Sequence, residues 1–280
     1  MTQKTNPLQQ FFRQPAIYLK LPSAGRFWPA GSLDLPQNGE LPVYPMTAID
    51  EITYRTPDAL FNGQAVVNVI QSCVPAIKNA WYVPNIDVSP LLIAIRIASY
   101  GHDMSLHSVC PACSHEEEYA LDLRTVLDQL HSPNFAQTLS IGDLDIVFRP
   151  VNYQQQNDSS IKQFEQQKII SAVPGSDLTE EQKLAKLTEA MKVITDLTIA
   201  VVAASIAMIK TPTASVTDFN QIEEFLRNCT SKVYNEIRDN VIALRQQSEI
   251  RPLKIACTEC ANQFEQPVDL DIANFFASAS

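Results

Sequence analysis

Four cysteines in two short turns are the residues of this chain best suited to chemistry. The turns are Cys110-Pro-Ala-Cys113 and Cys257-Thr-Glu-Cys260, and both have the C-x-x-C spacing that lets two thiolates face one metal ion. Each turn is followed at the same offset by an Asp-Leu pair, Asp122-Leu123 in one case and Asp269-Leu270 in the other. Two matched half-sites predict one shared tetrahedral zinc ion per chain, with Cys110, Cys113, Cys257 and Cys260 as its ligands.

A four-thiolate zinc ion would be structural, because no coordination position stays open for a substrate. The alternatives are packed thiols or a disulfide without metal, and a redox C-x-x-C, which would need a thioredoxin-like βαβ unit that the pattern lacks. The histidines at positions 102, 107, 115 and 131 surround the first turn. We interpret them as surface side chains rather than ligands, and we expect Cys73 and Cys229 to be core thiols. A zinc hydrolase that uses His115 is the enzymatic alternative.

The chain carries no other catalytic pattern: it has no glycine-rich phosphate loop, no H-E-x-x-H motif and no nucleophile elbow. Its 280 residues are 45% hydrophobic and 19% charged, which is typical of a folded globular protein. The net charge of −10 argues against nucleic-acid binding, since phosphate contacts need a basic face. The polar start lacks a signal peptide, which indicates synthesis in a cytoplasm. The apolar run 197–209 is too short to span a bilayer and is expected to form a buried helix.

The first 56 residues are rich in proline and are expected to be extended. The pair Phe11-Phe12 either docks on a partner or begins the fold. Alternating apolar residues predict a strand at 17–21. Asn38-Gly39 predicts a hairpin in which Ser32–Leu35 pairs with Glu40–Tyr44.

Helical patterns dominate the rest of the chain. Helices are expected after Thr47, over Asp58–Val74, Asp87–Tyr100 and Tyr153–Ala172, from Thr179 toward Lys210, and over Phe219–Gln247. Short strands are expected on both sides of the first cysteine turn, in a hairpin at 138–151, and at Pro252–Ala256.

The fold class is therefore α+β: a mainly helical body, an extended N-terminal arm with a β-hairpin, and a small zinc-ribbon-like module built from two distant C-x-x-C units. We divide the chain into the arm (1–56), a helical region (57–103), the first zinc-knuckle unit (104–134), a hairpin with a helical insertion (135–250), and the second zinc-knuckle unit with the C-terminal tail (251–280).

The N-terminal third contains several distinctive motifs in order: IYLKLPSAGRFWPAGSLDL, ELPVYPMTAIDEITYRTPDALFNG, VIQSCVPAIKNAW, DVSPLLIAIRIASYG and the CPAC turn. Together they resemble the baseplate hub and hub-assembly family of T-even-like contractile-tailed bacteriophages. The resemblance covers residues 15–123, and the closing CTEC turn is consistent with it. No motif of the middle segment, 135–248, contributes to it.

The resemblance implies a non-enzymatic structural component of the phage tail baseplate, at or near the central hub, in a virion assembled in the host cytoplasm. Its partners would be other baseplate and tail proteins, with no nucleic acid and no membrane, and self-association around the tail axis is left open. The alternatives are a transient assembly chaperone absent from the virion and a zinc-ribbon nucleic-acid binder. Leu21–Pro29 would be a contact surface, because aromatic and arginine side chains are common at interface hot spots. Alternatively, Phe27 and Trp28 pack this segment against helices of the same chain.

Overall fold

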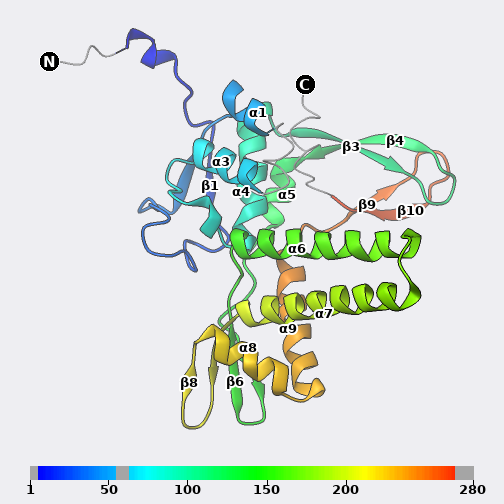
Figure 1. Cartoon of the computed structure of the whole chain (residues 1–280). Helices are drawn as coiled ribbons and strands as arrows, with labels where there is room; N and C mark the ends of the chain where they lie inside the picture. Colours follow the sequence, from blue (N-terminus) through cyan, green and yellow to red (C-terminus); the bar gives the residue numbers. More distant parts are fainter. Residues whose placement is uncertain (1–5, 55–62, 269–280) are drawn as a thin grey trace. The chain divides into compact units, whose positions relative to one another are not determined.

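The computed structural model describes residues 6–54 and 63–268 of the chain. About half of this part is helical, and its strands form small antiparallel sheets, so the expected mixture of helices and strands is confirmed (Figure 1). The chain divides into two compact units. Unit 1 comprises Met1–Ala80, Asp87–Leu130 and Ile250–Ser280, and unit 2 comprises Trp81–Ile86 and His131–Glu249.

Unit 1 begins with a 3-10 turn, η1 (Pro7–Phe11), and a two-stranded sheet of β1 (Ile17–Lys20) and β2 (Glu40–Val43). The predicted pairing of Ser32–Leu35 with Glu40–Tyr44 is wrong, because β2 pairs with β1 instead. The turn at Gly39 does form, with the Gly39 amide donating to Pro36 O at 2.8 Å. The backbone of 32–34 is bonded to 76–78, however, which leaves β2 free to pair with β1 and bury Leu41 and Val43.

Helices bury many of the apolar side chains of unit 1, such as Val66, Ile70 and Ile93. The helix expected over Asp58–Val74 is confirmed from Gln64 to Cys73, but Gly63 has a left-handed φ of 75°, so the expected single helix is interrupted there. Its expected start, over 58–62, lies outside the described residues. The helix expected after Thr47 and the helix expected over Asp87–Tyr100 are confirmed, and Thr47 caps the first of them. The helices of unit 1 are α1 (Ala48–Tyr54), α3 (Gln64–Cys73), α4 (Asn85–Tyr100) from Asp87 onward, and α5 (Leu123–Gln129); η2 (Ala80–Tyr82) lies where the chain passes from unit 1 into unit 2.

Two β-hairpins of unit 1 carry the cysteine turns. The first pairs β3 (Asp103–Val109) with β4 (Glu116–Asp122), and the second pairs β9 (Leu253–Ala256) with β10 (Gln263–Gln266). The strand-like flanks expected for the first turn and the strand expected before the second turn are confirmed. The Asp269-Leu270 pair that follows the second turn lies outside the described residues.

Unit 2 contains a four-stranded antiparallel sheet in the order β5-β6-β7-β8 and four long helices. Its first hairpin and the helix start predicted at Thr179 are confirmed, and Thr179 forms a capping box with Gln182. The strands are β5 (Leu139–Ile141), β6 (Leu144–Phe148), β7 (Ile206–Lys210) and β8 (Ser215–Val216), and the helices are α6 (Tyr153–Ala172), η3 (Val173–Gly175), α7 (Glu180–Ala204), α8 (Phe219–Asn228) and α9 (Ser231–Ser248).

The buried helix expected over 197–209 is wrong in its second half, because α7 ends at Ala204 and the chain continues as β7. β7 pairs with β6, placing Ile209 opposite Ile146. A two-stranded hairpin is marginal alone, and a third strand gives it an apolar face that can be buried. That face packs against the helices in one core, which includes Ile146, Phe148, Ile206, Ile222 and Ile237. None of the helices in the described residues is both long and apolar enough to cross a membrane.

Candidate metal centre

The two hairpins of unit 1 hold the cysteine turns in the same way. Val109, just before the first turn, pairs with Glu116, and Ala256, just before the second, pairs with Gln263. Because each hairpin keeps its two strands in fixed register, the thiols at its tip have a fixed direction. The two C-x-x-C turns are therefore similar in the strand pairing around them as well as in sequence.

The backbone inside the two turns is also equivalent. Cys110 N donates to the carbonyl five residues ahead at 2.9 Å, and Cys257 N does the same at 3.0 Å. The residues after the second cysteines, Ser114 and Ala261, both donate back to the first cysteine at 2.9 Å. Both are left-handed, with φ of 59° and 56°. These turns direct the two thiols of each hairpin to the same side.

The four sulfur atoms converge on one point. Cys110 Sγ lies 3.7 Å from Cys260 Sγ, and Cys113 Sγ lies 3.6 Å from Cys257 Sγ. All four lie within 4.8 Å of one another. Four sulfurs about 2.3 Å from a central ion form a tetrahedron with edges of about 3.8 Å. The four predicted cysteines are therefore brought together at a spacing that fits one metal ion.

Without a cation the thiols of Cys110 and Cys113 do not ionise together. Burial raises the pKa of Cys110, but hydrogen bonds from the amides of its own turn and from neighbouring thiols outweigh burial and lower the pKa to about 6. A backbone hydrogen bond from His115 lowers the pKa of Cys113, whereas its hydrogen bonds to the other thiols and its desolvation raise it to about 12. One thiolate is favoured and a second beside it is not, which is the usual result for acids that share a site.

Side-chain hydrogen bonds join the two hairpins beside the sulfurs. Thr258 Oγ1 donates to Glu117 Oε2 at 2.8 Å, and this bond is the main reason why the pKa of Glu117 is lowered. Tyr119 donates to the same carboxylate at 2.9 Å and lies 3.4 Å from the Ala256 carbonyl. Burial and the bond to Glu117 raise the pKa of Tyr119 to about 12. A further bond joins Ser108 Oγ to Gln266 Oε1 at 2.6 Å.

These contacts between the two hairpins were not predicted from the sequence. Strand alternation places Glu117 and Tyr119 on one face of β4, but no sequence signal pairs that face with Thr258.

The four histidines are not part of the cluster that the described residues form. His107 is exposed and lies 4.0 Å from Glu116, while His115 contributes its carbonyl to the first turn.

The left-handed residues of the turns give a test of the turn geometry. A side chain at this φ costs about 1 kcal/mol, and glycine removes that cost while adding disorder to the unfolded chain. We expect Ala261→Gly to leave the free energy of unfolding unchanged or to raise it by up to ~1 kcal/mol. Ala112→Gly, in the other turn but without a left-handed φ, is the control and is expected to lose about 0.5–1 kcal/mol. Urea unfolding of the two variants checks this; equal losses would contradict it.

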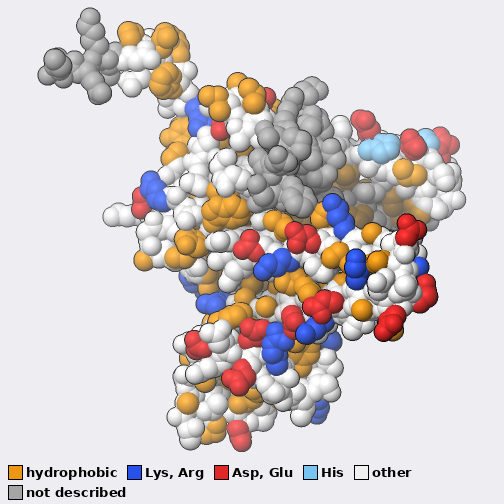
Figure 2. All heavy atoms as spheres, in the orientation of Figure 1, with side chains coloured by type: hydrophobic (Ala, Val, Ile, Leu, Met, Phe, Trp, Pro, Cys, Tyr) orange, Lys and Arg blue, Asp and Glu red, His pale blue; other side chains and the backbone are white. Residues whose placement is uncertain are grey.

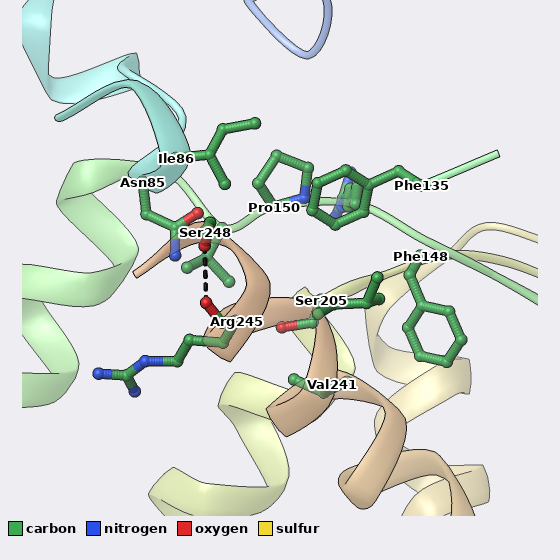
Figure 3. Close-up of a pocket in the computed structure, with 12 residues that line it drawn as sticks. Asn85, Ile86, Phe135, Phe148, Pro150, Ser205, Val241, Arg245 and Ser248 are labelled. Carbon is green, nitrogen blue, oxygen red and sulfur yellow. Dashed lines mark hydrogen bonds between the residues drawn. The ribbon is translucent and has the colours of Figure 1, made fainter. Parts of the chain in front are cut away.

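Two hollows in unit 2 offer no comparable chemistry. The smaller hollow, about 40 Å³, is lined by the C-terminal half of α9 and the end of β6, among other residues, and has room for a few water molecules (Figure 3). Asn85 lines it, and its buried Oδ1 has no hydrogen-bond partner among the described residues, so a water molecule there would satisfy it. The hydrogen bond drawn in Figure 3 joins the Ser248 hydroxyl to the Arg245 carbonyl.

The larger hollow, about 480 Å³, is a groove lined mainly by α6, α7 and α9. Its floor is apolar, with residues such as Leu197 and Val201. Its two arginines are each bonded to a neighbouring acid: Arg238 to Asp239 and Arg245 to Glu249. Its lining includes Asp158 and the neighbouring Ser159 and Ser160, but no hydrogen bond joins these hydroxyls to the carboxylate in the described part of unit 2. The cysteine cluster is therefore the best-formed candidate site.

Comparison with known proteins identifies one related family. The family described as T4 bacteriophage base plate protein matches residues 33–277. The match includes the middle segment, 135–248, in which the sequence showed no family motif. No curated protein and no solved structure is significantly similar to the chain.

Proposed function

Because this chain belongs to the T4 bacteriophage base plate protein family, we propose that it is a non-enzymatic structural component of a phage tail baseplate, at or near the central hub. The observation that carries this proposal is the family match over residues 33–277. Family membership makes the chain a baseplate protein of the virion tail, with other phage tail proteins as partners. The position at the hub and the lack of enzymatic activity belong to the proposal.

The arrangement of unit 1 supports a role in protein–protein contact. The segment Leu21–Pro29 is held rigidly from within, because the Trp28 indole donates to buried Asp87 at 3.0 Å. Phe27 lies at the surface with the Arg26 guanidinium over its ring. The Trp28 indole is therefore directed inward, whereas Phe27 is 38% exposed, and contact of Phe27 with a partner is part of the proposal. Arginine and aromatic side chains are typical of interface hot spots.

The cysteine cluster is assigned a structural zinc ion as part of the same proposal, one per chain, held by Cys110, Cys113, Cys257 and Cys260. The sulfur spacing supports a single ion, and an all-thiolate donor set favours zinc over hard cations such as magnesium. Such an ion would join two hairpins that lie far apart in the sequence. With four protein ligands it keeps no position for a substrate, which agrees with a structural role.

Quantitative mass spectrometry of purified virions tests the structural role. We expect the chain at a fixed copy number relative to an established tail protein. Absence from virions, with abundance in infected cells, would overturn the proposal in favour of a transient assembly chaperone. Electron cryomicroscopy of isolated baseplates tests the position, and density for this chain away from the tail axis would contradict placement at the hub.

A further inference from the structure

The first described residues of unit 1 leave several large apolar side chains uncovered. Residues 6–12, which we call the apolar segment, form η1, a single 3-10 turn in which Asn6 caps the Leu8 amide at 3.0 Å. None of its residues is buried. Leu8, Phe11 and Phe12 are between 55% and 75% exposed. Figure 2 shows these hydrophobic side chains on the turn near the N-terminus.

The chain becomes fixed immediately after the apolar segment, at Arg13. Its guanidinium donates to Pro45 O at 2.6 Å and to Ser72 O at 2.8 Å, and it forms an ion pair with Asp50 at 3.3 Å. Three separate acceptors hold this side chain, so the point where the segment leaves unit 1 is well defined. Asp50 belongs to α1, and the segment therefore starts beside that helix.

Helix α1 presents an apolar stripe to the surface rather than to the core. Asp50 accepts from the Thr47 amide at 2.7 Å and from its hydroxyl at 2.8 Å, which fixes the rotation of the helix about its axis. Asp50 and Tyr54 consequently face inward and are buried. Ile49 and Ile52, three residues apart, face outward and are at least 70% exposed. We call these two residues the α1 stripe.

From these two surfaces we infer that the apolar segment of one copy of the chain packs on the α1 stripe of a second copy, and that the exchange is reciprocal. The two surfaces match in chemistry. The segment contains no charged residue over 6–12. Among the described residues of α1, the carboxylate next to the stripe, Glu51, is half-buried and accepts a hydrogen bond from the Tyr100 hydroxyl at 2.9 Å. An uncharged apolar segment therefore meets an apolar stripe without burying an unpaired charge.

The amount of surface is sufficient for a dimer. Each of the five side chains exposes on the order of 100–150 Å², so a reciprocal exchange would cover about 1,200 Å² in total, at the lower end for a specific protein interface. One segment and one stripe per chain give a closed two-fold pair in which both are used up. A second copy is favoured over another partner because one chain supplies both complementary surfaces.

The test is the oligomeric state of the full-length chain, measured by sedimentation velocity over a range of concentrations. We expect a monomer–dimer equilibrium for the parent chain. Phe11→Ser with Phe12→Ser, and separately Ile49→Ser with Ile52→Ser, should each weaken dimerisation at least tenfold. The matched control is Leu184→Ser with Met191→Ser on α7, two side chains that are similarly exposed but belong to unit 2, and it should dimerise like the parent.

Mixing the two double variants distinguishes a reciprocal exchange of segments from weaker association that results from a general loss of hydrophobic surface. The Phe variant keeps its stripe and the Ile variant keeps its segment, so the mixture regains one of the two contacts and should form a weak heterodimer, while neither variant pairs with itself. A parent chain that stays monomeric, a dimer unaffected by both double variants, or a mixture without heterodimer would overturn the inference. Circular dichroism of each variant shows that these surface substitutions leave the fold intact. The inference does not depend on the baseplate role.

Discussion

Replacing Cys257 by serine is expected to release the metal ion and to separate the two hairpins of unit 1. Structural zinc sites have apparent binding free energies of about 10–16 kcal/mol, and three thiolates hold the ion much less tightly than four. Only a few side-chain hydrogen bonds would then join the hairpins, one of them to the Glu117 carboxylate, and together they contribute much less than the metal ion. We therefore expect Cys257→Ser to lower the free energy of unfolding of unit 1 by several kcal/mol, on the order of 5.

The measurement combines metal content with unfolding. Elemental analysis of the parent chain, purified without chelator, should give close to one zinc per chain, and the variant should give close to none. Cobalt added to the metal-free parent should show the thiolate-to-metal charge-transfer absorption of a four-sulfur site, which Cys257→Ser should weaken. Because thiolates must lose their protons to bind, acidification should release the ion from the parent.

Cys229→Ser is the matched control. Cys229 lies at the end of α8 in unit 2 and is no part of the cluster. Its replacement should leave the zinc content at the parent value. A parent chain without zinc, or a Cys257→Ser chain that still binds one equivalent, would refute the shared site, and equal loss in both variants would point to a general effect of cysteine removal.

The cysteine cluster and most helices could be predicted because their signals are local. A C-x-x-C turn fixes the direction of its two thiols within four residues, so two similar turns were sufficient to indicate one cluster. In the same way the side chains of Thr47 and Thr179 marked helix starts through hydrogen bonds to residues three positions away. Such bonds form within one turn of the chain and leave a clear trace in the sequence.

Strand pairing was predicted less well because it depends on distant residues. The Asn38-Gly39 turn forms, yet β2 pairs with β1, because residues 76–78 already occupy the backbone of 32–34. The run 197–209 has a composition that suits a buried helix or a buried strand equally. The last residues of this run form β7 because they pair with the edge of β6. In both cases the deciding hydrogen bonds come from another part of the chain.

The role of Asp87 could not be predicted from the sequence for the same reason. The residues that donate to it, Ser23 and Trp28, lie about 60 positions earlier in the chain. The carboxylate lies in the first turn of α4 and is fully buried. It accepts from the Ser23 amide at 2.9 Å, from the Ser23 hydroxyl at 2.5 Å and from the Trp28 indole at 3.0 Å. Asp87 is thus the internal support of the Leu21–Pro29 segment, in which Ala24, Gly25 and Phe27 all have left-handed φ angles.

Removing this carboxylate should therefore be costly. In Asp87→Ala three donors lose their acceptor, and a buried donor without a partner costs about 1–3 kcal/mol. We expect the free energy of unfolding to fall by about 3–5 kcal/mol, and amide hydrogen exchange over residues 22–29 to accelerate. Asp34→Ala is the control, because Asp34 is exposed and forms a surface ion pair with Lys78; it should change stability by less than about 1 kcal/mol.

The protonation of Asp87 gives the same prediction a second, independent readout. Burial raises the pKa of Asp87 to about 6, although the hydrogen bonds from Ser23 and Trp28 act to lower it. The folded state therefore holds this proton more tightly than the unfolded state, whose carboxyl has its ordinary pKa near 4. The stabilising contribution is complete below about pH 4 and is lost as the pH rises through about 6, by roughly 2–3 kcal/mol.

Asp87→Asn cannot titrate and keeps one acceptor oxygen, so the part of the pH dependence that comes from this residue should disappear. Urea unfolding at pH 4, 5, 6 and 7 should show the parent losing stability relative to Asp87→Asn as the pH rises. Parallel curves for the two proteins would contradict a raised pKa at Asp87. If Asp87→Ala left both stability and exchange over residues 22–29 unchanged, the carboxylate would not be what holds Phe27 at the surface.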